Sequence, residues 1–243
     1  MHKIYVVGMG PGEEQMMTPQ AHHALEESDT IIGYHAYLQL LGKAYQKKEL
    51  LSTPMKQEVE RCRLCFEKAR QGKVVSMVCS GDAGIYGMAS LLYEMGKEYP
   101  DCTLEVVPGI TAASSGAAVL GAPLNHDFCV ISLSDLLTPW EQIERRLAAA
   151  AEGDFAIALY NPSSHKRADY LKRACDILAA HGVEETRACG YVENIGREGT
   201  KTMTGTLSQL RECSVNMFTT VFIGNSQSEI VNGKLITKRG YPI

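Results

Sequence analysis

The feature that most constrains the fold is a regular alternation of short apolar segments with longer segments of helical character. The apolar segments are rich in Val, Ile and Leu, and the segments between them carry helix-forming residues and helix-start signals. Strands are predicted at residues 3–8, 30–33, 74–79, 104–107, 129–133, 155–160, 188–192 and 219–223. Helices are predicted at residues 18–28, 54–71, 85–98, 112–120, 139–152 and 165–181. This pattern predicts an α/β fold of mainly parallel sheets flanked by helices on both faces.

A break in the middle of the chain suggests two domains. A helix of small residues ends near residue 120, Gly121 and Pro123 interrupt it, and a new series of strands and helices begins. A length of 243 residues allows one large or two small domains. We therefore expect an α/β domain over residues 1–122 and a second over residues 123–243, with a ligand cleft between them.

Composition excludes several classes of partner. The formal net charge is −4, so no overall basic field recruits nucleic acid. No apolar run approaches the roughly 18 residues that a membrane span requires. The N-terminus lacks a basic segment followed by an apolar signal core. A cytoplasmic protein with neither a nucleic-acid nor a membrane partner is expected.

The eight cysteines are scattered, and Cys62 and Cys65 form the one C-x-x-C spacing. Both lie on one face of the helix predicted at residues 54–71, and no second pair completes a metal site. We interpret the cysteines as reduced thiols that pack as small hydrophobic groups, with no metal. Ligation of a metal or cluster by Cys62 and Cys65 is the alternative. His22 and His23 are interpreted as surface residues of a helix.

The loop after the first strand, "GMGPG", raises the question of a dinucleotide site. A dinucleotide fingerprint needs G-x-G-x-x-G, and Glu13 stands where the third glycine belongs. Pro11 also removes a backbone donor that a pyrophosphate would use, and the helix begins late, after Met17. The loop is then either a strand-ending turn or a place where the backbone approaches a ligand without a diphosphate.

Other loops follow strands in both halves of the chain: "CSGDAGIYGMAS", "VVPGITAASSGAAVLGAP", "LSDLLTPW" and "ALYNPSSHKR". Gly81, Gly84 and Gly87 permit close approach of the backbone in the first of them, and Asp82 stands at the strand end. In open parallel sheets ligands bind outside the carboxyl ends of the strands. These loops favour one composite ligand site.

Together these motifs resemble those of the tetrapyrrole (corrin/porphyrin) methylase family over essentially the whole chain. The resemblance is carried by "GMGPGEEQMMTPQA", "SGDAGIYGMA" and "VPGITAASSGAA". The segments "SLSDLLTPW", "YNPSS", "ENIGREG" and "FIGNSQSEIVNGKLITKRGYPI" are most similar to the members that methylate C-17 and contract the ring. Met17 stands where the family usually carries leucine.

The resemblance implies an S-adenosylmethionine-dependent enzyme of cobalamin biosynthesis and a homodimer. Its substrate is an anionic tetrapyrrole of the precorrin-3B or cobalt-factor III type, methylated at C-17 with ring contraction. Whether cobalt is already present in that substrate stays open. The positions that match the family's cofactor motifs are Gly10, Pro11, Gly81, Asp82, Ile85, Thr111, Ala112, Tyr160, Asn161, Asn194 and Gly196.

An acidic protein needs a local basic patch to bind such an anionic macrocycle. The substrate-binding candidates are Lys166, Arg167, Arg197 and Lys201, since cationic side chains suit carboxylates. Ordinary solvated charges are the alternative for each. Methyl transfer mainly needs positioning of donor and acceptor, whereas ring contraction needs proton transfers. The candidate catalytic groups are Asp82, His126, Ser134 and Asp135. A structural role for His126 and a turn role for Asp135 are the alternatives.

Three other functions remain open at this point. A nicotinamide-dependent dehydrogenase would use Asp29 to bind ribose. A non-catalytic tetrapyrrole carrier would bind the macrocycle without S-adenosylmethionine. A sister methylase would act at another position of the ring.

Overall fold

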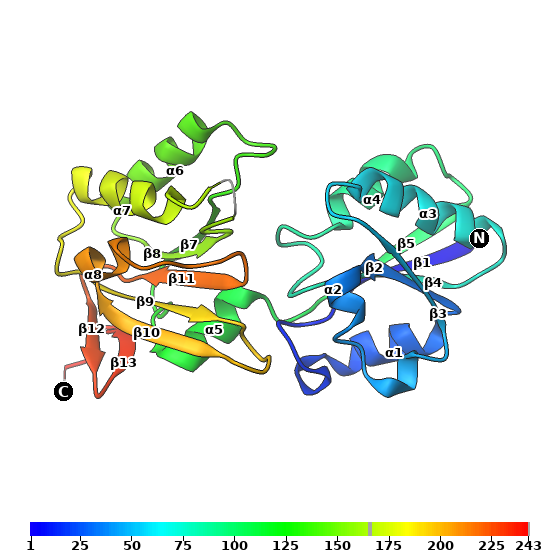
Figure 1. Ribbon diagram of the computed structural model, residues 1–243, viewed down its shortest axis with the longest axis horizontal. Coiled ribbons are helices and arrows are strands. Elements are labelled where there is room, and N and C mark those ends of the chain that lie inside the picture. The colour runs from blue at the N-terminus through cyan, green and yellow to red at the C-terminus, as the bar shows by residue number, and fades with distance from the viewer. Residues whose placement is uncertain (165–166, 243) are drawn as a thin grey trace. The chain divides into compact units, whose positions relative to one another are not determined.

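The computed structural model describes residues 1–164 and 167–242, and the chain forms two compact units (Figure 1). The first unit is Met1–Ala112, and the second begins at Ala113. We expected the division at residue 122, after the small-residue helix. The boundary between the two compact units instead lies at the start of that helix. The reason is packing: a Cβ on Gly116 would lie 2.8 Å from the Phe222 ring, so this helix lies directly against the second sheet.

The first unit contains one five-stranded sheet in the order β3-β2-β4-β1-β5, with every pairing parallel. Its elements are β1 (His2–Gly8), α1 (Pro19–Glu27), β2 (Thr30–Tyr34), α2 (His35–Leu38), β3 (Glu49–Thr53), α3 (Glu58–Arg70), β4 (Val75–Cys79), α4 (Ala89–Gly96) and β5 (Cys102–Val107). Short 3₁₀ turns lie at Glu14–Met16 and Lys43–Tyr45. The parallel sheet predicted for this half is confirmed.

Helices cover both faces of this sheet because successive side chains of a strand point to opposite faces. Ile4 and Val6 of β1 pack in the core with α3 and α4, whereas Tyr5 and Val7 pack in the core with α1. The apolar run of β1 is thereby buried on both sides, as a central parallel strand should be. Strand β3 was not predicted, since it lies at the sheet edge and Leu50 and Leu51 are its only apolar residues.

Local signals explain where the helices begin. The Thr18 hydroxyl accepts a hydrogen bond from the Ala21 amide at 3.1 Å, and Pro19 occupies the first turn of α1, as predicted. Two helices begin later than predicted. The left-handed φ of 64° at Lys56 delays α3 to Glu58, and the φ of 54° at Tyr86 delays α4 to Ala89, because neither residue then fits a right-handed helix.

The second unit contains a five-stranded sheet in the order β10-β9-β11-β8-β7 and a three-stranded sheet in the order β12-β13-β6. Its elements are α5 (Ala112–Leu120), β6 (Gly121–Ala122), β7 (Phe128–Ser132), α6 (Trp140–Glu152), β8 (Ala156–Tyr160), α7 (Tyr170–Ala180), β9 (Ala188–Glu193), β10 (Lys201–Thr206), α8 (Leu207–Arg211), β11 (Thr219–Ile223), β12 (Ser228–Val231) and β13 (Lys234–Thr237). Helices α6 and α7 pack on one face of the larger sheet, and α5 lies on the other (Figure 1).

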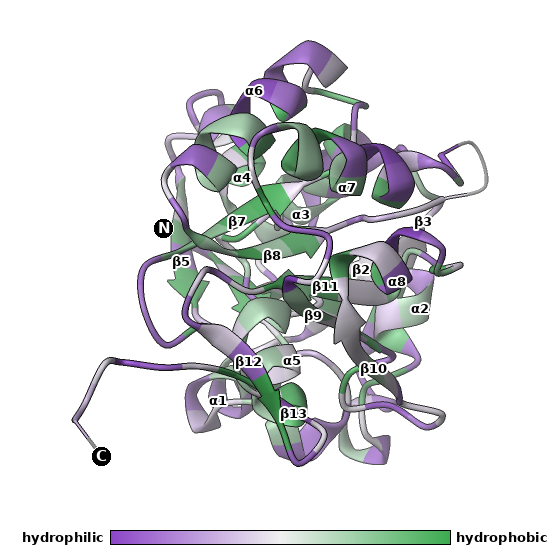
Figure 2. Cartoon of the chain, turned by 90° about the vertical axis from the view of Figure 1, so that its left-hand side faces the viewer, coloured by the Kyte–Doolittle hydropathy of each residue, from purple (hydrophilic) through white to green (hydrophobic). Residues whose placement is uncertain are grey.

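The prediction of a mainly parallel sheet is wrong for this half. Among the described residues of its five-stranded sheet, β7 and β8 are the one parallel pair; β11 runs antiparallel to β8 and β9, and β10 runs antiparallel to β9. Parallel neighbours need a long crossover connection, but β9 and β10 are joined by residues 194–200 alone. The α/β class itself is confirmed. Figure 2 shows β7 and β8 in hydrophobic colours and the outer helix α6 mostly in hydrophilic ones.

The hairpin of β12 and β13 was also missed, although the sequence carries a signal for it. Asn232 and Gly233 connect the strands with φ values of 50° and 75°. Two left-handed residues, commonly Asn-Gly, are the signature of a tight hairpin turn. None of the helices in the part of the chain that the structure describes has the length and apolar character to cross a bilayer.

Candidate functional site

In the first unit, the glycine loops after β1 and β4 are joined by backbone hydrogen bonds. The Gly10 amide donates to the Gly81 carbonyl at 3.0 Å, and the Gly81 amide donates to the Gly10 carbonyl at 2.7 Å. Their φ values of 74° and 71° are left-handed, which glycine adopts without steric cost. Gly10 and Gly81, both predicted cofactor contacts, therefore lie side by side at the carboxyl ends of two parallel strands.

A third loop, after β5, closes on these two. A Cβ on Gly109 would lie 2.2 Å from the Gly81 carbonyl oxygen and 2.5 Å from the Gly8 carbonyl oxygen. A Cβ on Gly8 would lie 2.6 Å from the Gly109 amide nitrogen. Three backbone segments thus meet where no side chain fits. The glycines build a tight backbone platform at the carboxyl ends of β1, β4 and β5, and they do not form a phosphate cradle.

Asp82 holds this platform together. One of its carboxylate oxygens accepts from the amides of Gly84 at 2.8 Å and Ile85 at 3.2 Å, and the other accepts from the Gly109 amide at 2.9 Å. Hydrogen bonds from amides to a carboxylate are stronger than neutral ones. Asp82 was predicted as a cofactor contact and as a catalytic group; the structure shows it as the group that fixes the geometry of two loops.

The remaining candidates of the first unit lie around the platform. Pro11 is buried, Thr111 and Ala112 are half-buried, and Ile85 is 40% exposed. Ile85 and the exposed Tyr86 form an apolar tip on the loop after β4. These positions present backbone and apolar contacts with few charges.

Asp29 does not share this edge. It precedes β2, at the amino end of the sheet, and its carboxylate accepts from the Val74 amide at 2.9 Å. A ribose bound at the carboxyl ends of the strands lies out of its reach. The role that a dehydrogenase would give to Asp29 is therefore wrong for this fold.

In the second unit, one edge of the larger sheet gathers most of the remaining candidates. Strands β8 and β9 both run antiparallel to β11, and β7 runs parallel to β8, so β7, β8 and β9 end at the same edge, where β10 begins. The candidates that this topology places there are Ser134, Asp135, Tyr160, Asn161, Arg167, Asn194, Gly196, Arg197 and Lys201. Lys166 lies outside the described residues.

His126 is not part of this group. It is exposed and precedes β7, so it lies at the amino end of that strand. Five strand residues rise roughly 17 Å, which separates His126 from Ser134 and Asp135. The prediction grouped the three as catalytic candidates, and the structure brings only Ser134 and Asp135 together.

Arg167 is the centre of a hydrogen-bonded network at this edge. Its guanidinium donates to the hydroxyls of Ser134 at 2.8 Å and Ser164 at 2.9 Å, and to the Asp135 carboxylate at 3.2 Å. The Tyr170 hydroxyl donates to the other Asp135 oxygen at 2.7 Å. Arg167 is thus a positioned, partly neutralised cation and not a solvated charge.

We expect the pKa of Asp135 to lie below its ordinary value of 3.8, because Tyr170 donates to the carboxylate and Arg167 lies beside it. A carboxyl group whose pKa falls on folding stabilises the protein above its unfolded pKa, and this stabilisation is lost as the pH falls through the folded value. Replacing Tyr170 with phenylalanine should raise the pKa of Asp135 towards 3.8. Titration of the carboxyl carbon by NMR measures both values, and an unchanged pKa in the variant would contradict the hydrogen bond from Tyr170 to Asp135.

Two asparagines follow strands at this edge in the left-handed conformation, with φ values of 54° at Asn161 and 55° at Asn194. The Asn161 side chain donates to the Ser132 hydroxyl at 2.9 Å. The Asn194 carbonyl accepts from the Thr200 hydroxyl at 2.8 Å and from the Arg197 amide at 3.0 Å. Left-handed residues other than glycine cluster at functional sites, and these two are held by specific partners.

The other second-unit candidates have distinct partners. The Tyr160 hydroxyl accepts from the Ala113 amide at 2.6 Å in the first turn of α5. The Arg197 guanidinium lies 5.3 Å from the centre of the Phe218 ring. Lys201 is mostly exposed and lies 3.8 Å from the Glu193 carboxylate. Lys201 is therefore closer to an ordinary surface charge than Arg167 is.

Sequence reasoning did not name Ser132, Ser164 or Tyr170, although all three bond to candidate residues. Ser164 lies in the "YNPSS" segment that carried the resemblance, so that segment is the signal for it. Ser132 ends β7, and Tyr170 begins α7. Their roles depend on which loops meet in space.

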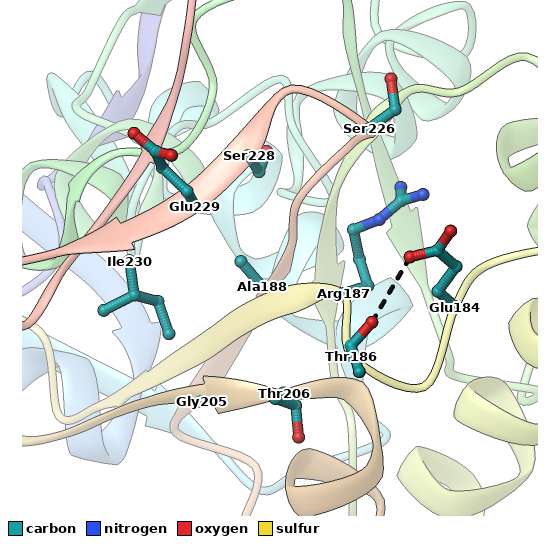
Figure 3. A pocket seen from close by; sticks show the side chains of 10 residues that line it. All are labelled: Glu184, Thr186, Arg187, Ala188, Gly205, Thr206, Ser226, Ser228, Glu229 and Ile230. Carbon is teal, nitrogen blue, oxygen red and sulfur yellow. Dashed lines mark hydrogen bonds between the residues drawn. The ribbon is translucent and has the colours of Figure 1, made fainter.

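A pocket of about 340 Å³ lies at the opposite edge of the same sheet, where β9 begins and β10 ends (Figure 3). Arg187 lines it and pairs with the Asp154 carboxylate at 3.3 Å. Figure 3 also shows Thr186 donating to Glu184, at 3.4 Å. No predicted site residue lines this pocket.

Cys62 and Cys65 lie in the core of the first unit with Phe66 and Met77. Burial raises the pKa of Cys62 to about 12 and that of Cys65 well above its ordinary value. Thiols held in the protonated form are poor metal ligands. Over residues 1–164 and 167–242, no three His, Cys, Asp or Glu side chains are grouped so as to hold a metal ion.

Comparisons with known proteins place this fold and these loops in a family. The sequence profile described as "Tetrapyrrole (Corrin/Porphyrin) Methylases" matches residues 3–211. The "Probable cobalt-factor III C(17)-methyltransferase" of Salmonella typhimurium is 43% identical over 241 residues, which is 99% of this chain and all of that protein. Some other curated relatives are longer, and the chain spans 53% and 45% of two of them.

Solved structures agree with the sequence matches. The crystal structure of the methyltransferase CobJ superimposes with a TM-score of 0.90 at 35% identity, covering 98% of this chain and all of that one. The uroporphyrin-III C-methyltransferase of Thermus thermophilus, complexed with S-adenosylhomocysteine, has the same fold, with a TM-score of 0.72 at 19% identity over 91% of this chain and 97% of that one. This chain belongs to the tetrapyrrole (corrin/porphyrin) methylase family.

Proposed function

We propose that the protein is a cobalt-factor III C(17)-methyltransferase of cobalamin biosynthesis that uses S-adenosylmethionine as methyl donor. The observation that carries this proposal is the 43% identity to the Salmonella typhimurium relative along the full length of both chains. The Thermus thermophilus relative, which binds S-adenosylhomocysteine, supports the choice of donor. Ring contraction accompanies methylation in this proposal.

The residues of the first unit suit such a donor. A sulfonium cofactor without phosphates needs close backbone contacts and a few polar groups. The platform formed by Gly8, Gly81 and Gly109 supplies bare backbone, and Ile85 supplies an exposed apolar contact. The proposed donor contacts are Gly10, Pro11, Gly81, Asp82, Ile85, Thr111 and Ala112, together with Tyr160, Asn161, Asn194 and Gly196 of the second unit.

The chemistry asks the protein mainly to position its reactants. A bound donor would supply an electrophilic methyl group for transfer to a carbon of the macrocycle. The backbone platform held by Asp82 fixes the loops that orient the donor. No nucleophilic side chain and no metal is part of this proposal.

The edge of the second sheet suits the anionic macrocycle. Arg167 and Arg197 present guanidinium groups there, and Lys201 adds an exposed ammonium. We propose that Ser134 and Asp135, which share hydrogen bonds with Arg167, contact the ring-contraction site and carry protons there. His126 lies at the opposite edge and has no part in this proposal.

The test is incubation of the protein with methyl-labelled S-adenosylmethionine and either cobalt-factor III or metal-free precorrin-3B. Mass spectrometry and NMR of the product should show one added methyl group at C-17 and a contracted ring. A methylated but uncontracted ring would keep the family activity and remove the specific assignment. Binding of the macrocycle without any affinity for S-adenosylhomocysteine would indicate a carrier instead.

We also propose a homodimer, as the family resemblance implies. Sedimentation equilibrium measures the mass of the protein in solution directly. A monomer at all concentrations would remove this part of the proposal and leave the proposed activity in place.

A further inference from the structure

A cavity of about 210 Å³ lies in the first unit at the carboxyl ends of β2 and β4. Its walls include Tyr34, Tyr37, Arg61, Cys79, Tyr86 and Met88. Pockets for whole small-molecule ligands usually have volumes of roughly 300–1,000 Å³. This cavity is smaller, so it suits one side group of a larger ligand.

Arg61 is the unusual residue of this cavity. It is only 5% exposed, although it is charged. One terminal nitrogen donates to the backbone carbonyls of Thr53 at 3.3 Å and Pro54 at 3.1 Å, whereas Nε is buried without an acceptor. Within the described residues, Arg61 forms no ion pair with a carboxylate.

A buried guanidinium without an anion is costly, because it has lost its hydration and gained no counter-charge. Glu58 also lines the cavity, but it is exposed and accepts from the Lys56 amide at 3.2 Å. The backbone carbonyls hold the guanidinium in place without neutralising it. An anion from outside the protein would supply the missing partner.

We propose that this cavity binds a carboxylate side group of the macrocyclic substrate through Arg61, an inference that rests on the proposed function. The planar fork of arginine suits two-point binding of a carboxylate. Tyr34 and Tyr37, whose ring centres lie 5.3 Å apart in an edge-to-face arrangement, form an aromatic wall of the cavity. Arg61 is then a substrate-positioning residue that fixes the orientation of the ring over the donor.

A carboxylate is also present on the methionine part of the donor, and the sheet order argues against that source. The backbone platform lies over β1, β4 and β5, whereas the cavity lies between β4 and β2. The two places are neighbours that share the loop after β4. The donor and the macrocycle can therefore occupy them together.

The test compares Arg61→Gln with Arg63→Gln on the same helix. Both remove one positive charge from α3, but Arg63 is exposed and pairs with Glu60 on the surface. We expect Arg61→Gln to raise the Kd of cobalt-factor III roughly 10- to 100-fold, as the loss of hydrogen bonds to a charged group would. The Kd of S-adenosylhomocysteine, measured by calorimetry, should change less than about 2-fold. Arg63→Gln should change neither.

Two further arms keep the inference falsifiable. Arg61→Lys keeps the charge and should bind the macrocycle more tightly than Arg61→Gln does. This variant also replaces Arg61→Gln as the test if the glutamine variant fails to fold. The macrocycle with its carboxylates converted to methyl esters should bind wild type and Arg61→Gln with nearly equal affinity, because the coupled pair is already broken.

The outcomes separate the two proposals. A wild-type protein that neither binds nor methylates the macrocycle would overturn the proposed function. A wild-type protein that methylates it, with Arg61→Gln behaving like Arg63→Gln, would overturn only the carboxylate site. A raised Kd for S-adenosylhomocysteine with an unchanged macrocycle Kd would also overturn it, since the donor would then supply the carboxylate.

Discussion

Replacing Gly109 with alanine is expected to lower the free energy of unfolding by about 3 kcal/mol, at the upper end of the usual cost of overpacking. The new Cβ would lie 2.2 Å from the Gly81 carbonyl oxygen and 2.5 Å from the Gly8 carbonyl oxygen. Gly8 is the last residue of β1, and Gly81 lies in the loop that hydrogen bonds join to Gly10. Both neighbours are therefore held backbone atoms, and neither can move away as a flexible side chain would. Urea unfolding measures the change.

The same variant should also lose affinity for S-adenosylhomocysteine. The loops after β1, β4 and β5 would have to separate to make room for the added alanine side chain. Gly72→Ala is the matched control. Gly72 has a φ of +83° but nothing within 4 Å of its added Cβ, so it should cost only about 1 kcal/mol of backbone strain and leave binding unchanged. Equal costs for the two variants would contradict the close approach of the three loops.

Replacing Asp82 with alanine is expected to lower the free energy of unfolding by about 2 kcal/mol and to weaken S-adenosylhomocysteine binding at least about 10-fold. The amides of Gly84, Ile85 and Gly109 would lose their shared acceptor. Since two of these amides lie on an exposed loop, water replaces part of the loss. Calorimetry measures the change in binding, and urea unfolding measures the change in stability.

Asp82→Asn distinguishes a positioning role from acid–base catalysis. Asparagine keeps one acceptor oxygen for Gly84 and Ile85 but offers an amide group towards Gly109. A positioning role predicts that turnover falls in parallel with donor affinity, whereas an acid–base role predicts lost turnover with donor affinity retained. Asp29→Ala is the control, since the Asp29 carboxylate accepts from the Val74 amide at the opposite edge of the sheet, and its loss should leave binding unchanged.

Much of the first unit could be predicted because its signals are local. The continuous apolar run of β1, the cap at Thr18 and the glycines of the three loops all lie within short stretches of sequence. Each acts through its own backbone conformation or through the period of its side chains. The edge strand β3 was missed because it carries too few apolar residues for such a pattern to appear.

The candidate site was predictable in its residues more than in its arrangement. The sequence indicates Asp82 as a polar group at a strand end, but it does not indicate its three amide partners. Arg167 was expected to be a free cation for the substrate, yet it is tied to Ser134 and Asp135. The sequence does not single out Arg61, because within "EVERCRLC" it resembles any charged residue of an amphipathic helix.

By itself, the sequence determined the α/β class, the family resemblance and the loops that end the strands, because these depend on local periodicity, turn residues and short motifs. Only the tertiary structure decided that the second sheet is mixed, that His126 lies away from Asp135, and that Arg61 is buried without an anion. Strand direction, shared edges and burial all depend on contacts between residues far apart in the chain. No local pattern records which distant segment will provide those contacts.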